Sequence, residues 1–391
     1  MSITALEPLG RDAPDTDQLT GLVHAITGDP LAVPLSSRAE PFPYAIGTPS
    51  TAALLSVSGT ARRSDGSTTE WRCFVKQLQS ARHWPMLHLI PEAYREDLVQ
   101  NLPWRLELGV LRSDVGTVMP AGLRLPTVYR IDEYDDDRAT IWMEYVVQEP
   151  GIWGLDRFAR AAFLLGQLSA RRRPHLVKPF LPRPGVDQPG IGLRYYVNGR
   201  VLMGALPTLA DKATWRTPLL AAAICNTGDH SLRDDLLELA EQLPAVLDAL
   251  DALPQCYQHG DASPQNLLVP LGSPDEFVVI DWGFDCPQAI GFDLGQLLIG
   301  LVHAGELSPT ALPAVHQVIL EAFTEGLAAE GLQVPLEQVR YGYLGSLLAR
   351  ATFTALPLEQ LGMPATEEGL AQFESRVLLT RALVDLTRQL N

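Results

Sequence analysis

Cysteine and histidine are both scarce in this sequence, and neither forms a cluster. The four cysteines show no CxxC pair and no spacing typical of a disulfide framework; they are Cys73, Cys225, Cys256 and Cys286. We therefore expect free thiols in a reducing compartment. The eight histidines contain no HxH or HxxxH group. Because zinc hydrolases usually draw several ligands from clustered histidines, this pattern disfavours that class of enzyme.

Long apolar runs and a surplus of basic residues are also missing. No stretch approaches the roughly 18 uninterrupted apolar residues of a membrane-spanning helix, and no basic segment followed by an apolar one indicates a signal peptide. We therefore expect a cytoplasmic protein with no membrane partner. The chain has 30 basic and 46 acidic residues, a net charge of −16. This acidic charge disfavours a general nucleic-acid binder. It either attracts a cationic ligand or only keeps the protein soluble. The sequence indicates no obligate protein partner.

The chain does have enough apolar side chains for a sizeable core. Apolar residues make up 46% of its 391 residues, a proportion typical of folded proteins rather than disordered chains. This length predicts two domains or one bilobal domain.

The most informative stretch combines two aspartates and an asparagine. Asp261 is followed five residues later by Asn266, and Asp281 ends a short apolar run. Phosphoryl transfer needs a carboxylate that accepts a hydroxyl proton, and hard oxygen ligands for Mg²⁺ on the phosphates. We expect residues 266–270 and 276–281 to form a hairpin that brings the Asn and the second Asp to one end. Turns also favour Asp and Asn, but that preference does not explain a carboxylate directly after an apolar strand.

Three short motifs resemble those of one known family. HGDASPQN at 259–266 and VVIDWGF at 278–284 are similar to the two signatures of the aminoglycoside phosphotransferase and choline kinase superfamily, and GFDL at 291–294 resembles the Gly-x-Asp-Leu that follows them. The resemblance covers residues 40–300 and is most specific at 257–294. It implies an α+β, bilobal protein-kinase-like fold, with a small antiparallel β-sheet N-lobe and a larger, mainly helical C-lobe.

The resemblance also implies a domain organisation. We expect an N-terminal tail and short helix at 1–30, a nucleotide-clamping N-lobe at 31–146, and a helical C-lobe with the catalytic loop and acceptor site at 147–391. Residues 1–18 are predicted to be loose, and residues 171–189 to form a proline-rich basic linker. Helical spacing of apolar residues predicts helices at 17–26, 155–170 and 231–250, with several more after residue 300.

The expected activity follows from the same resemblance. The chain would be a kinase that uses ATP and Mg²⁺ to phosphorylate a hydroxyl of a small molecule, such as an aminoglycoside or other antibiotic, an aminosugar or an amino alcohol. Asp261 is the expected catalytic base, and Asn266 and Asp281 are the expected metal ligands. We expect Asp293 to brace the catalytic loop and His259 to pack within it.

The N-lobe is expected to hold the nucleotide through a lysine–glutamate pair. Residues 52–61 and 70–76 are predicted strands around a turn at 64–68. Lys76 is the expected ligand of the nucleotide phosphates. Glu107 lies on the apolar face of a helix predicted to begin at Pro103 and would pair with the lysine. An edge-strand lysine and a glutamate with its carboxylate in water are the alternatives.

A loop and a hinge complete the expected nucleotide site. Ser50 and Thr51 end a Gly47–Thr51 segment that would cover the phosphates through backbone N–H groups and hydroxyls. This segment departs from the GxGxxG pattern of protein kinases, and a plain Gly-Pro turn is the alternative. Two further strands are predicted at 124–131 and 140–147. Glu144 and Val146 lie in the hinge expected at 143–146, near the end of the second strand, where the adenine edge would meet backbone groups.

Other functions stay open at this point. A nucleotide-binding pseudokinase-like interaction module is disfavoured because every residue expected at the site is present. A metal-dependent phosphoesterase would use His259 and Asp261. A protein kinase is disfavoured because the short stretch between Asp281 and Gly291 leaves little platform for a peptide. Three acidic residues either line a site for a cationic acceptor or are ordinary surface carboxylates; they are Asp229, Asp285 and Glu306.

Overall fold

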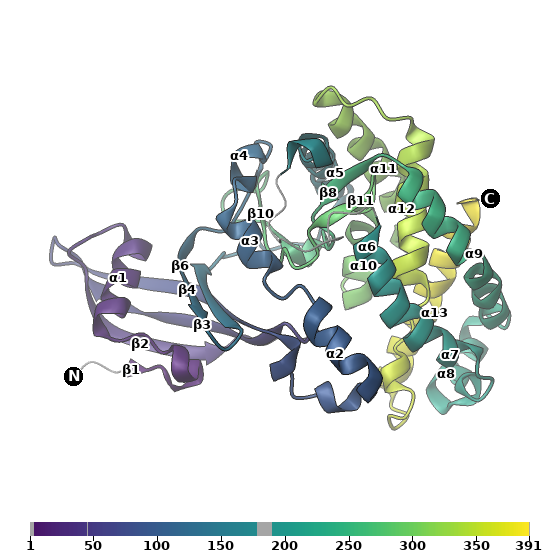
Figure 1. Ribbon diagram of the computed structural model, residues 1–391, viewed down its shortest axis with the longest axis horizontal. Coiled ribbons are helices and arrows are strands. Elements are labelled where there is room, and N and C mark those ends of the chain that lie inside the picture. Colours follow the sequence, from purple (N-terminus) through teal and green to yellow (C-terminus); the bar gives the residue numbers. More distant parts are fainter. Residues whose placement is uncertain (1–3, 45, 178–189, 391) are drawn as a thin grey trace. The chain divides into compact units, whose positions relative to one another are not determined.

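The chain divides into two compact units. The computed structural model describes residues 4–44, 46–177 and 190–390. Unit 1 comprises Met1–Leu111 and Leu125–Gln148, and unit 2 comprises Arg112–Arg124 and Glu149–Asn391 (Figure 1). The expected boundary between residues 146 and 147 stays a prediction, as does the role of each lobe. Residues 178–189 of the expected proline-rich linker lie outside the described residues.

Unit 1 is built on a six-stranded sheet with the strand order β1-β2-β3-β4-β7-β6. Its strands are β1 (Thr4–Ala5), β2 (Val33–Pro41), β3 (Thr51–Arg62), β4 (Thr68–Gln79), β6 (Val128–Tyr134) and β7 (Arg138–Glu144). The pairing is antiparallel throughout except between β1 and β2. In β4, buried and more exposed side chains alternate, as expected for a strand with one face against the core. Trp71, Cys73 and Val75 are buried on one face, and the residues between them are more exposed.

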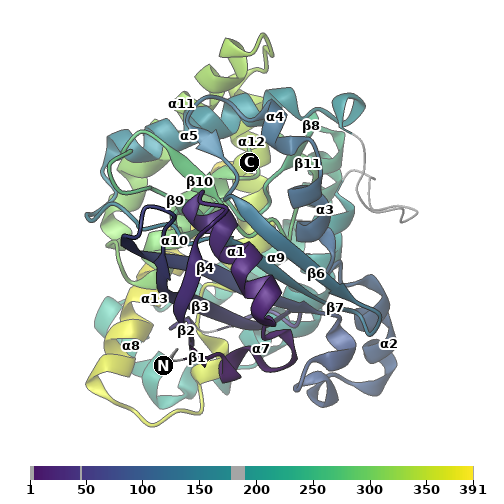
Figure 2. The same cartoon turned by 90° about the vertical axis from the view of Figure 1, so that its left-hand side faces the viewer.

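Helix α1 (Thr16–Thr27) covers one face of this sheet (Figure 2). It begins with a capping box, in which the Asp15 side chain accepts from the Gln18 backbone and the Gln18 side chain accepts from the Asp15 backbone. It ends at Gly28, whose left-handed backbone closes the last turn. Buried Leu22 and Val23 join the core of β2, β3 and β4. The predicted short helix is therefore present. Its apolar face packs against the sheet, which is why that face is apolar.

From residue 4 onward, the segment predicted to be a loose tail is ordered. After β1, a 3₁₀ helix η1 (Glu7–Asp12) leads to α1. The Asp12 Oδ2 atom accepts hydrogen bonds from Gln77 Nε2 at 2.7 Å and from Thr140 Oγ1 at 2.5 Å. These two partners lie on β4 and β7, so the segment is tied to the sheet through contacts across more than 60 residues of sequence. Local composition carries no signal of such contacts.

The remaining elements of unit 1 lie between β4 and residue 112. They are the 3₁₀ helices η2 (Ala81–His83) and η3 (Leu87–Leu89), and the helices α2 (Glu92–Asn101) and α3 (Leu106–Arg112). The helix predicted to begin at Pro103 begins at Leu106 instead. The reason is local, because the Leu106 N–H bonds to the Pro103 carbonyl at 2.9 Å and closes a turn before the helix. Leu108 is buried against Ile141 of the sheet, with Trp104 and others beside it.

Unit 2 is mainly helical. Its helices are α4 (Val115–Val118), α5 (Leu155–Arg171), α6 (Ile191–Tyr196), α7 (Leu206–Ala210), α8 (Pro218–Thr227), α9 (Leu232–Ala252), α10 (Leu294–Ala304), α11 (Leu312–Ala329), α12 (Leu336–Leu347) and α13 (Glu367–Thr387). Two π-helical segments, η5 (Val197–Ala205) and η9 (Leu348–Thr352), continue α6 and α12. Short 3₁₀ turns are η4 (Pro174–Leu176), η6 (Thr214–Arg216), η7 (Pro264–Asn266), η8 (Pro309–Ala311), η10 (Leu358–Gln360) and η11 (Arg388–Leu390). Helix α5 packs along α11 in both cartoon views (Figures 1 and 2).

The helical predictions for this unit agree with the structure. Helix α9 spans the predicted 231–250 segment, and its apolar stripe is buried; the stripe includes Leu232, Leu236, Leu239, Leu243, Val246, Leu247 and Leu250. Helix α5 spans the predicted 155–170 segment. In both, apolar residues recur three or four positions apart, which places them on one helix face. None of the helices in the described part of the chain combines the length and the apolar character needed to cross a membrane.

Two small sheets in unit 2 carry the motif region. One has the order β5-β10-β9 and the other pairs β11 with β8. Their strands are β5 (Leu123–Arg124), β8 (Gln255–Gln258), β9 (Leu267–Leu268), β10 (Phe277–Val279) and β11 (Cys286–Ala289). The predicted hairpin is present as β9 and β10, with Leu267 opposite Val279. The strand expected at 124–131 is interrupted, because β5 pairs in parallel with β10 of this unit whereas β6 belongs to the sheet of unit 1. The α+β prediction is confirmed by this antiparallel sheet and these helices.

Candidate active site

The carboxylate of Asp261 is held from two sides within unit 2. Its Oδ1 atom accepts a hydrogen bond from Arg350 Nη2 at 2.8 Å. Its Oδ2 atom accepts from Asn266 Nδ2 at 3.2 Å, and the same amide nitrogen donates to the Asp261 carbonyl at 2.8 Å. The Asp261 side chain is 25% exposed. A carboxylate with a fixed orientation and partial access to solvent is what a general base requires.

Asp293 fixes the start of the loop predicted to be catalytic. Its two carboxylate oxygens accept the backbone N–H groups of His259 at 2.9 Å and Gly260 at 2.8 Å. Burial raises the pKa of Asp293, whereas the two backbone donors and the neighbouring Arg350 charge act to lower it. The position of Gly260 excludes larger residues, because its φ is +82° and a Cβ atom there would lie 2.3 Å from the Phe284 carbonyl oxygen.

His259 links the loop to the end of β10. Its Nδ1 atom accepts the Asp261 N–H at 3.1 Å, and its Nε2 atom lies 2.9 Å from the Ile280 carbonyl oxygen. The ring packs against Trp282 with centroids 4.6 Å apart, and the residue is fully buried. Both ring nitrogens are therefore occupied by the backbone, which agrees with a packing role and leaves neither nitrogen for a second base.

Asn266 and Asp281 lie at the same end of the β9–β10 hairpin. The Ile280 N–H donates to the Asn266 carbonyl at 3.0 Å, so the residue before Asp281 is bonded directly to Asn266. Asp281 has a φ of +60°, one of two non-glycine residues in the described chain with a positive φ. Such a backbone costs of order 1–3 kcal/mol and persists where surrounding contacts determine it, often at functional sites.

The donor atoms at this end of the hairpin suit Mg²⁺. Because Asn266 Nδ2 is used by Asp261, the amide oxygen is the atom of Asn266 that remains for a cation. Amide and carboxylate oxygens are hard ligands, and Mg²⁺ commonly takes only one or two protein ligands beside phosphate and water. Among residues 4–44, 46–177 and 190–390, no group of three or more His, Cys, Asp or Glu could hold a metal ion. By their donor atoms, an amide oxygen and a carboxylate, Asn266 and Asp281 fit a phosphate-bound Mg²⁺ with few protein ligands.

Unit 1 contains the predicted lysine–glutamate pair. Lys76 Nζ lies 2.6 Å from Glu107 Oε2, and the two side chains are 9% and 6% exposed. Lys76 comes from β4 and Glu107 from α3. A buried pair of this kind is costly to desolvate, and removing one partner leaves an uncompensated charge. The pair is therefore expected to hold the lysine ammonium in one place.

The other expected nucleotide residues lie at or next to the ends of strands β3 and β7 in unit 1. Thr51 begins β3 opposite Leu78 of β4, and the carbonyl of Ser50 accepts the Gln79 N–H at 2.9 Å. Glu144 ends β7, and its Oε2 atom accepts the Thr127 N–H at 3.1 Å. Val146 follows in a half-buried segment without regular structure. These contacts do not test nucleotide binding, so the roles of these residues stay predictions.

Two of the three acidic residues considered for a cationic acceptor have other partners. Asp285 is almost fully buried and forms a two-pronged ion pair with Arg172, at 2.6 and 3.0 Å. Asp229 forms a similar pair with Arg381 of α13, at 2.6 and 2.8 Å. Only Glu306 of the three is exposed. Asp285 is thus neither a surface carboxylate nor part of an open acidic site.

The cysteines beside the motifs, Cys256 and Cys286, are buried and form no disulfide. All four cysteines of the chain are free. Burial raises the pKa of Cys256 and of Cys286 to about 12. Since the thiolate is the nucleophilic form, these thiols are expected to be chemically inert.

Arg350 is the residue that sequence reasoning missed. It lies in η9, 89 residues after Asp261 and within the C-terminal region that resembles the superfamily only in being helical. It belongs to no recognisable motif, and no local signal would have identified it. The structure nevertheless brings it into direct contact with the predicted base.

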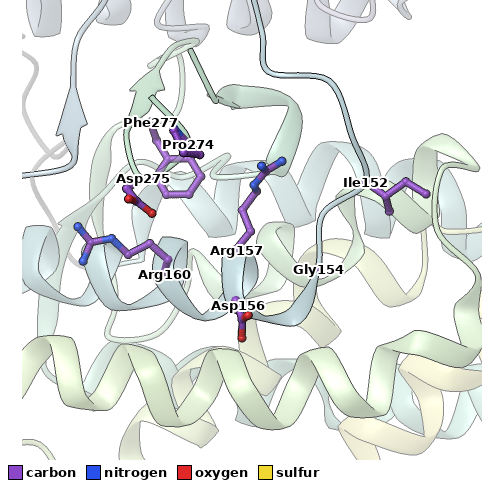
Figure 3. Close-up of a pocket in the computed structure, with 8 residues that line it drawn as sticks. All are labelled: Ile152, Gly154, Asp156, Arg157, Arg160, Pro274, Asp275 and Phe277. Atoms are coloured by element: carbon purple, nitrogen blue, oxygen red, sulfur yellow. The ribbon is translucent and has the colours of Figure 1, made fainter. Parts of the chain in front are cut away.

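A separate cavity of about 290 Å³ opens beside α5. It is lined by Ile152, Gly154, Asp156, Arg157, Arg160, Pro274, Asp275 and Phe277. Figure 3 shows Arg157 and Arg160 extending from α5 toward the segment that carries Pro274 and Phe277. None of the predicted site residues lines this cavity, so it is distinct from the arrangement around Asp261.

Replacing Asp293 with alanine is expected to destabilise the protein. The change leaves two buried backbone N–H groups, on His259 and Gly260, without their acceptor. Each buried donor left unsatisfied costs about 1–3 kcal/mol, so we expect the free energy of unfolding to fall by roughly 2–6 kcal/mol. Urea denaturation measures the change. Asp293→Asn keeps one acceptor oxygen and should lose less, and a wild-type midpoint in the alanine variant would contradict the bracing role.

Comparison with known proteins agrees with this geometry. Residues 203–330 match a family model described as "Phosphotransferase enzyme family", and the matched segment contains Asp261, Asn266, Asp281 and Asp293. None of the curated proteins is similar enough to this chain to be matched.

Three solved structures illustrate the range of similar proteins. An aminoglycoside phosphotransferase from Alicyclobacillus acidocaldarius is 16% identical, with 88% of this chain and 91% of that chain covered and a TM-score of 0.44. An ethanolamine kinase from Plasmodium vivax is 9% identical, with coverage of 91% and 83% and a TM-score of 0.45. A choline kinase from Cryptosporidium parvum is 11% identical, with coverage of 90% and 88% and a TM-score of 0.45. At such low similarity these structures decide nothing about substrate. The family match confirms the resemblance predicted from the motifs and the prediction of a kinase: residues 203–330 of this chain are similar to the phosphotransferase enzyme family.

Proposed function

We propose that this kinase transfers the γ-phosphoryl group of ATP to a hydroxyl group of a small molecule. The observation that carries the proposal is the Asp261 carboxylate, fixed by Asn266 and Arg350 on a loop braced by Asp293. Asp281 follows at the end of the hairpin that begins next to Asn266. Asp261, Asn266 and Asp281 all fall within the matched segment 203–330.

Asp261 is the proposed base. The acceptor oxygen attacks the γ-phosphorus, the bond from that phosphorus to the β,γ-bridging oxygen breaks, and ADP leaves. The proton of the acceptor hydroxyl passes to the Asp261 carboxylate. Positioning and electrostatic stabilisation supply most of the acceleration in such reactions.

Asn266 and Asp281 are the residues that would hold Mg²⁺. When bound, Mg²⁺ neutralises charge on the phosphate oxygens. Asn266 has a second role through its amide nitrogen, which donates to both the side chain and the carbonyl of Asp261. Any substitution of Asn266 would therefore disturb the base together with the metal site.

The proposed nucleotide ligands are in unit 1. Lys76 is proposed to contact the α- and β-phosphates, with Glu107 holding its ammonium group at 2.6 Å. Ser50 and Thr51 are proposed to lie over the phosphates, and the backbone near Glu144 and Val146 to meet the adenine edge. The side chains of Glu144 and Val146 are not expected to determine specificity.

The proposed acceptors are aminoglycosides or other antibiotics, aminosugars and amino alcohols. A cytoplasmic location, where ATP is available, belongs to the same proposal. A pseudokinase-like interaction module is the alternative, and it would bind nucleotide without turnover. Lys76, Glu107, Asp261, Asn266 and Asp281 are all present, which favours the active enzyme.

The test is ADP release from Mg-ATP across a panel of aminoglycosides, macrolides, aminosugars, simple sugars and amino alcohols. We expect one class to stimulate ADP release well above the rate without acceptor. Lys76→Met should abolish the stimulation, since it removes the proposed phosphate ligand and takes the ammonium partner away from the buried Glu107 carboxylate. Lys212→Met, which changes an exposed lysine of unit 2, is the matched control. Nucleotide binding without stimulation by any acceptor would favour the pseudokinase alternative.

A further inference from the structure

Arg350 occupies an unusual segment at the end of α12. The helix continues into η9 (Leu348–Thr352), a π-helical turn. Such turns insert an extra residue into a helix and occur frequently at functional sites. The Arg350 side chain is only 10% exposed. A guanidinium group is rarely buried to this degree unless it is paired.

The guanidinium group donates hydrogen bonds to both the Asp261 side chain and the backbone of the catalytic loop. Its Nη2 atom donates to Asp261 Oδ1 at 2.8 Å, and its Nη1 atom donates to the Gly260 carbonyl. The planar fork of an arginine suits two acceptors held at a fixed separation, whereas a lysine ammonium would act as a single point charge. The Arg350 contact is therefore specific for the loop conformation as well as for the charge of Asp261.

Aromatic rings surround the same guanidinium group. Its Cζ atom lies 4.9 Å from the ring centroid of Phe284, 5.6 Å from that of Tyr196 and 5.7 Å from that of Phe292. A cation within about 6 Å of a ring centroid is attracted by the ring quadrupole. Three rings from separate parts of unit 2 thus restrain where the guanidinium can lie.

The carboxylate of Asp261 keeps room for a substrate proton despite these contacts. An ionised carboxylate offers about four lone-pair sites. Arg350 uses one on Oδ1 and Asn266 uses one on Oδ2. The remaining sites stay available to an acceptor hydroxyl, so the ion pair orients the base without blocking it.

We propose that Arg350 is a positioning residue for phosphoryl transfer, which holds the Asp261 carboxylate in the orientation that accepts the hydroxyl proton. The proposal rests on the proposed function, because it assigns Asp261 as the base. Without Arg350 the carboxylate keeps one weak side-chain bond, from Asn266 at 3.2 Å, and is free to rotate. A misplacement of about 1 Å can cost about 10²-fold in rate.

The experiment compares Arg350→Met, Arg350→Lys and a control, Arg340→Met, in the full-length chain. Arg340 lies on the same helix, with its side chain 33% exposed and paired with Glu337 on the surface. The assay is ADP release from Mg-ATP with an acceptor active in the panel or, if none is active, with water as the acceptor. We expect Arg350→Met to lower kcat by about 10²-fold while KM for ATP stays unchanged. Arg350→Lys should recover part of the loss, and the control should match the wild type.

A double-mutant cycle separates positioning from general loss of structure. If Arg350 acts through Asp261, Arg350→Met should have no further effect on the residual rate of Asp261→Asn. A full additional loss in that background would overturn the proposal, as would a wild-type kcat in Arg350→Met. ATP affinity measured by calorimetry should be equal in all these variants, and its loss in Arg350→Met would indicate a structural role instead.

The outcomes also distinguish this proposal from the proposed function. An inactive Asp261→Asn beside an Arg350→Met of wild-type activity would leave the kinase function intact and reject the role of Arg350. A wild-type protein that releases no ADP with any acceptor or with water would reject both.

Discussion

Asp261→Asn is expected to lower kcat by about 10²–10⁴-fold, the range that a positioned general base contributes. The substitution keeps the size of the side chain but removes the atom that takes the acceptor proton. ATP binding should be unchanged, because the proposed phosphate ligand Lys76 is held by Glu107 within unit 1. A loss confined to kcat is the result of removing an interaction made in the transition state.

The measurement combines single-turnover ADP release with ATP affinity from calorimetry. Asp275→Asn is the matched control, since Asp275 is an exposed carboxylate on the turn before β10. We expect the control to behave like the wild type in both assays. Near-normal turnover of Asp261→Asn would reject Asp261 as the base. The metal-dependent phosphoesterase hypothesis would then be tested next, with Zn²⁺ or Mn²⁺ and phosphoesters.

Asp281→Asn is expected to lower kcat by about 10²–10³-fold, comparable to the loss of one strong electrostatic stabiliser of the transition state. The change removes the negative charge proposed to hold Mg²⁺ and keeps one oxygen donor. Asparagine is the appropriate replacement because position 281 has a φ of +60°, a region that asparagine tolerates and alanine does not. The effect should therefore report on the metal and not on backbone strain.

A Mg²⁺ titration tests this second prediction. The Mg²⁺ concentration for half-maximal activity should rise in Asp281→Asn and stay unchanged in Asp275→Asn. A readout independent of turnover is the rise in melting temperature caused by Mg-ATP, which follows from preferential binding to the folded state. This rise should shrink in the Asp281 variant. The same half-maximal concentration in variant and wild type would exclude Asp281 as a metal ligand.

Together the two variants separate the active kinase from a pseudokinase-like module. An interaction module that binds nucleotide without transferring phosphate has no turnover for Asp261→Asn to reduce. It would still lose the Mg-ATP stabilisation in Asp281→Asn. Stabilisation that depends on Asp281, in a protein whose wild type releases no ADP, would therefore favour the alternative.

The sequence by itself determined the elements with a strong local pattern. The strands at β3 and β4 follow from alternating apolar residues, and α9 follows from apolar residues on one helix face. The proximity of the motif residues was also predictable from their short spacing in the sequence. Asp261 and Asn266 are five residues apart and contact each other directly, and the β9–β10 hairpin carries the chain from Asn266 to Asp281. The apolar helix face around Glu107 indicated that its carboxylate needs a partner, and the resemblance to kinases implied that this partner is Lys76.

Only the tertiary structure decided which distant residues meet at these elements. Arg350 reaches Asp261 across 89 residues, Asp285 is taken by Arg172 across 113, and Asp12 is fixed to Thr140 across 128. An ion pair or hydrogen bond between residues so far apart depends on the packing of whole helices and strands, and leaves no periodicity in the local sequence. The residues of the candidate site were therefore predictable from short motifs, whereas Arg350, the proposed positioning residue for Asp261, became visible only in the folded chain.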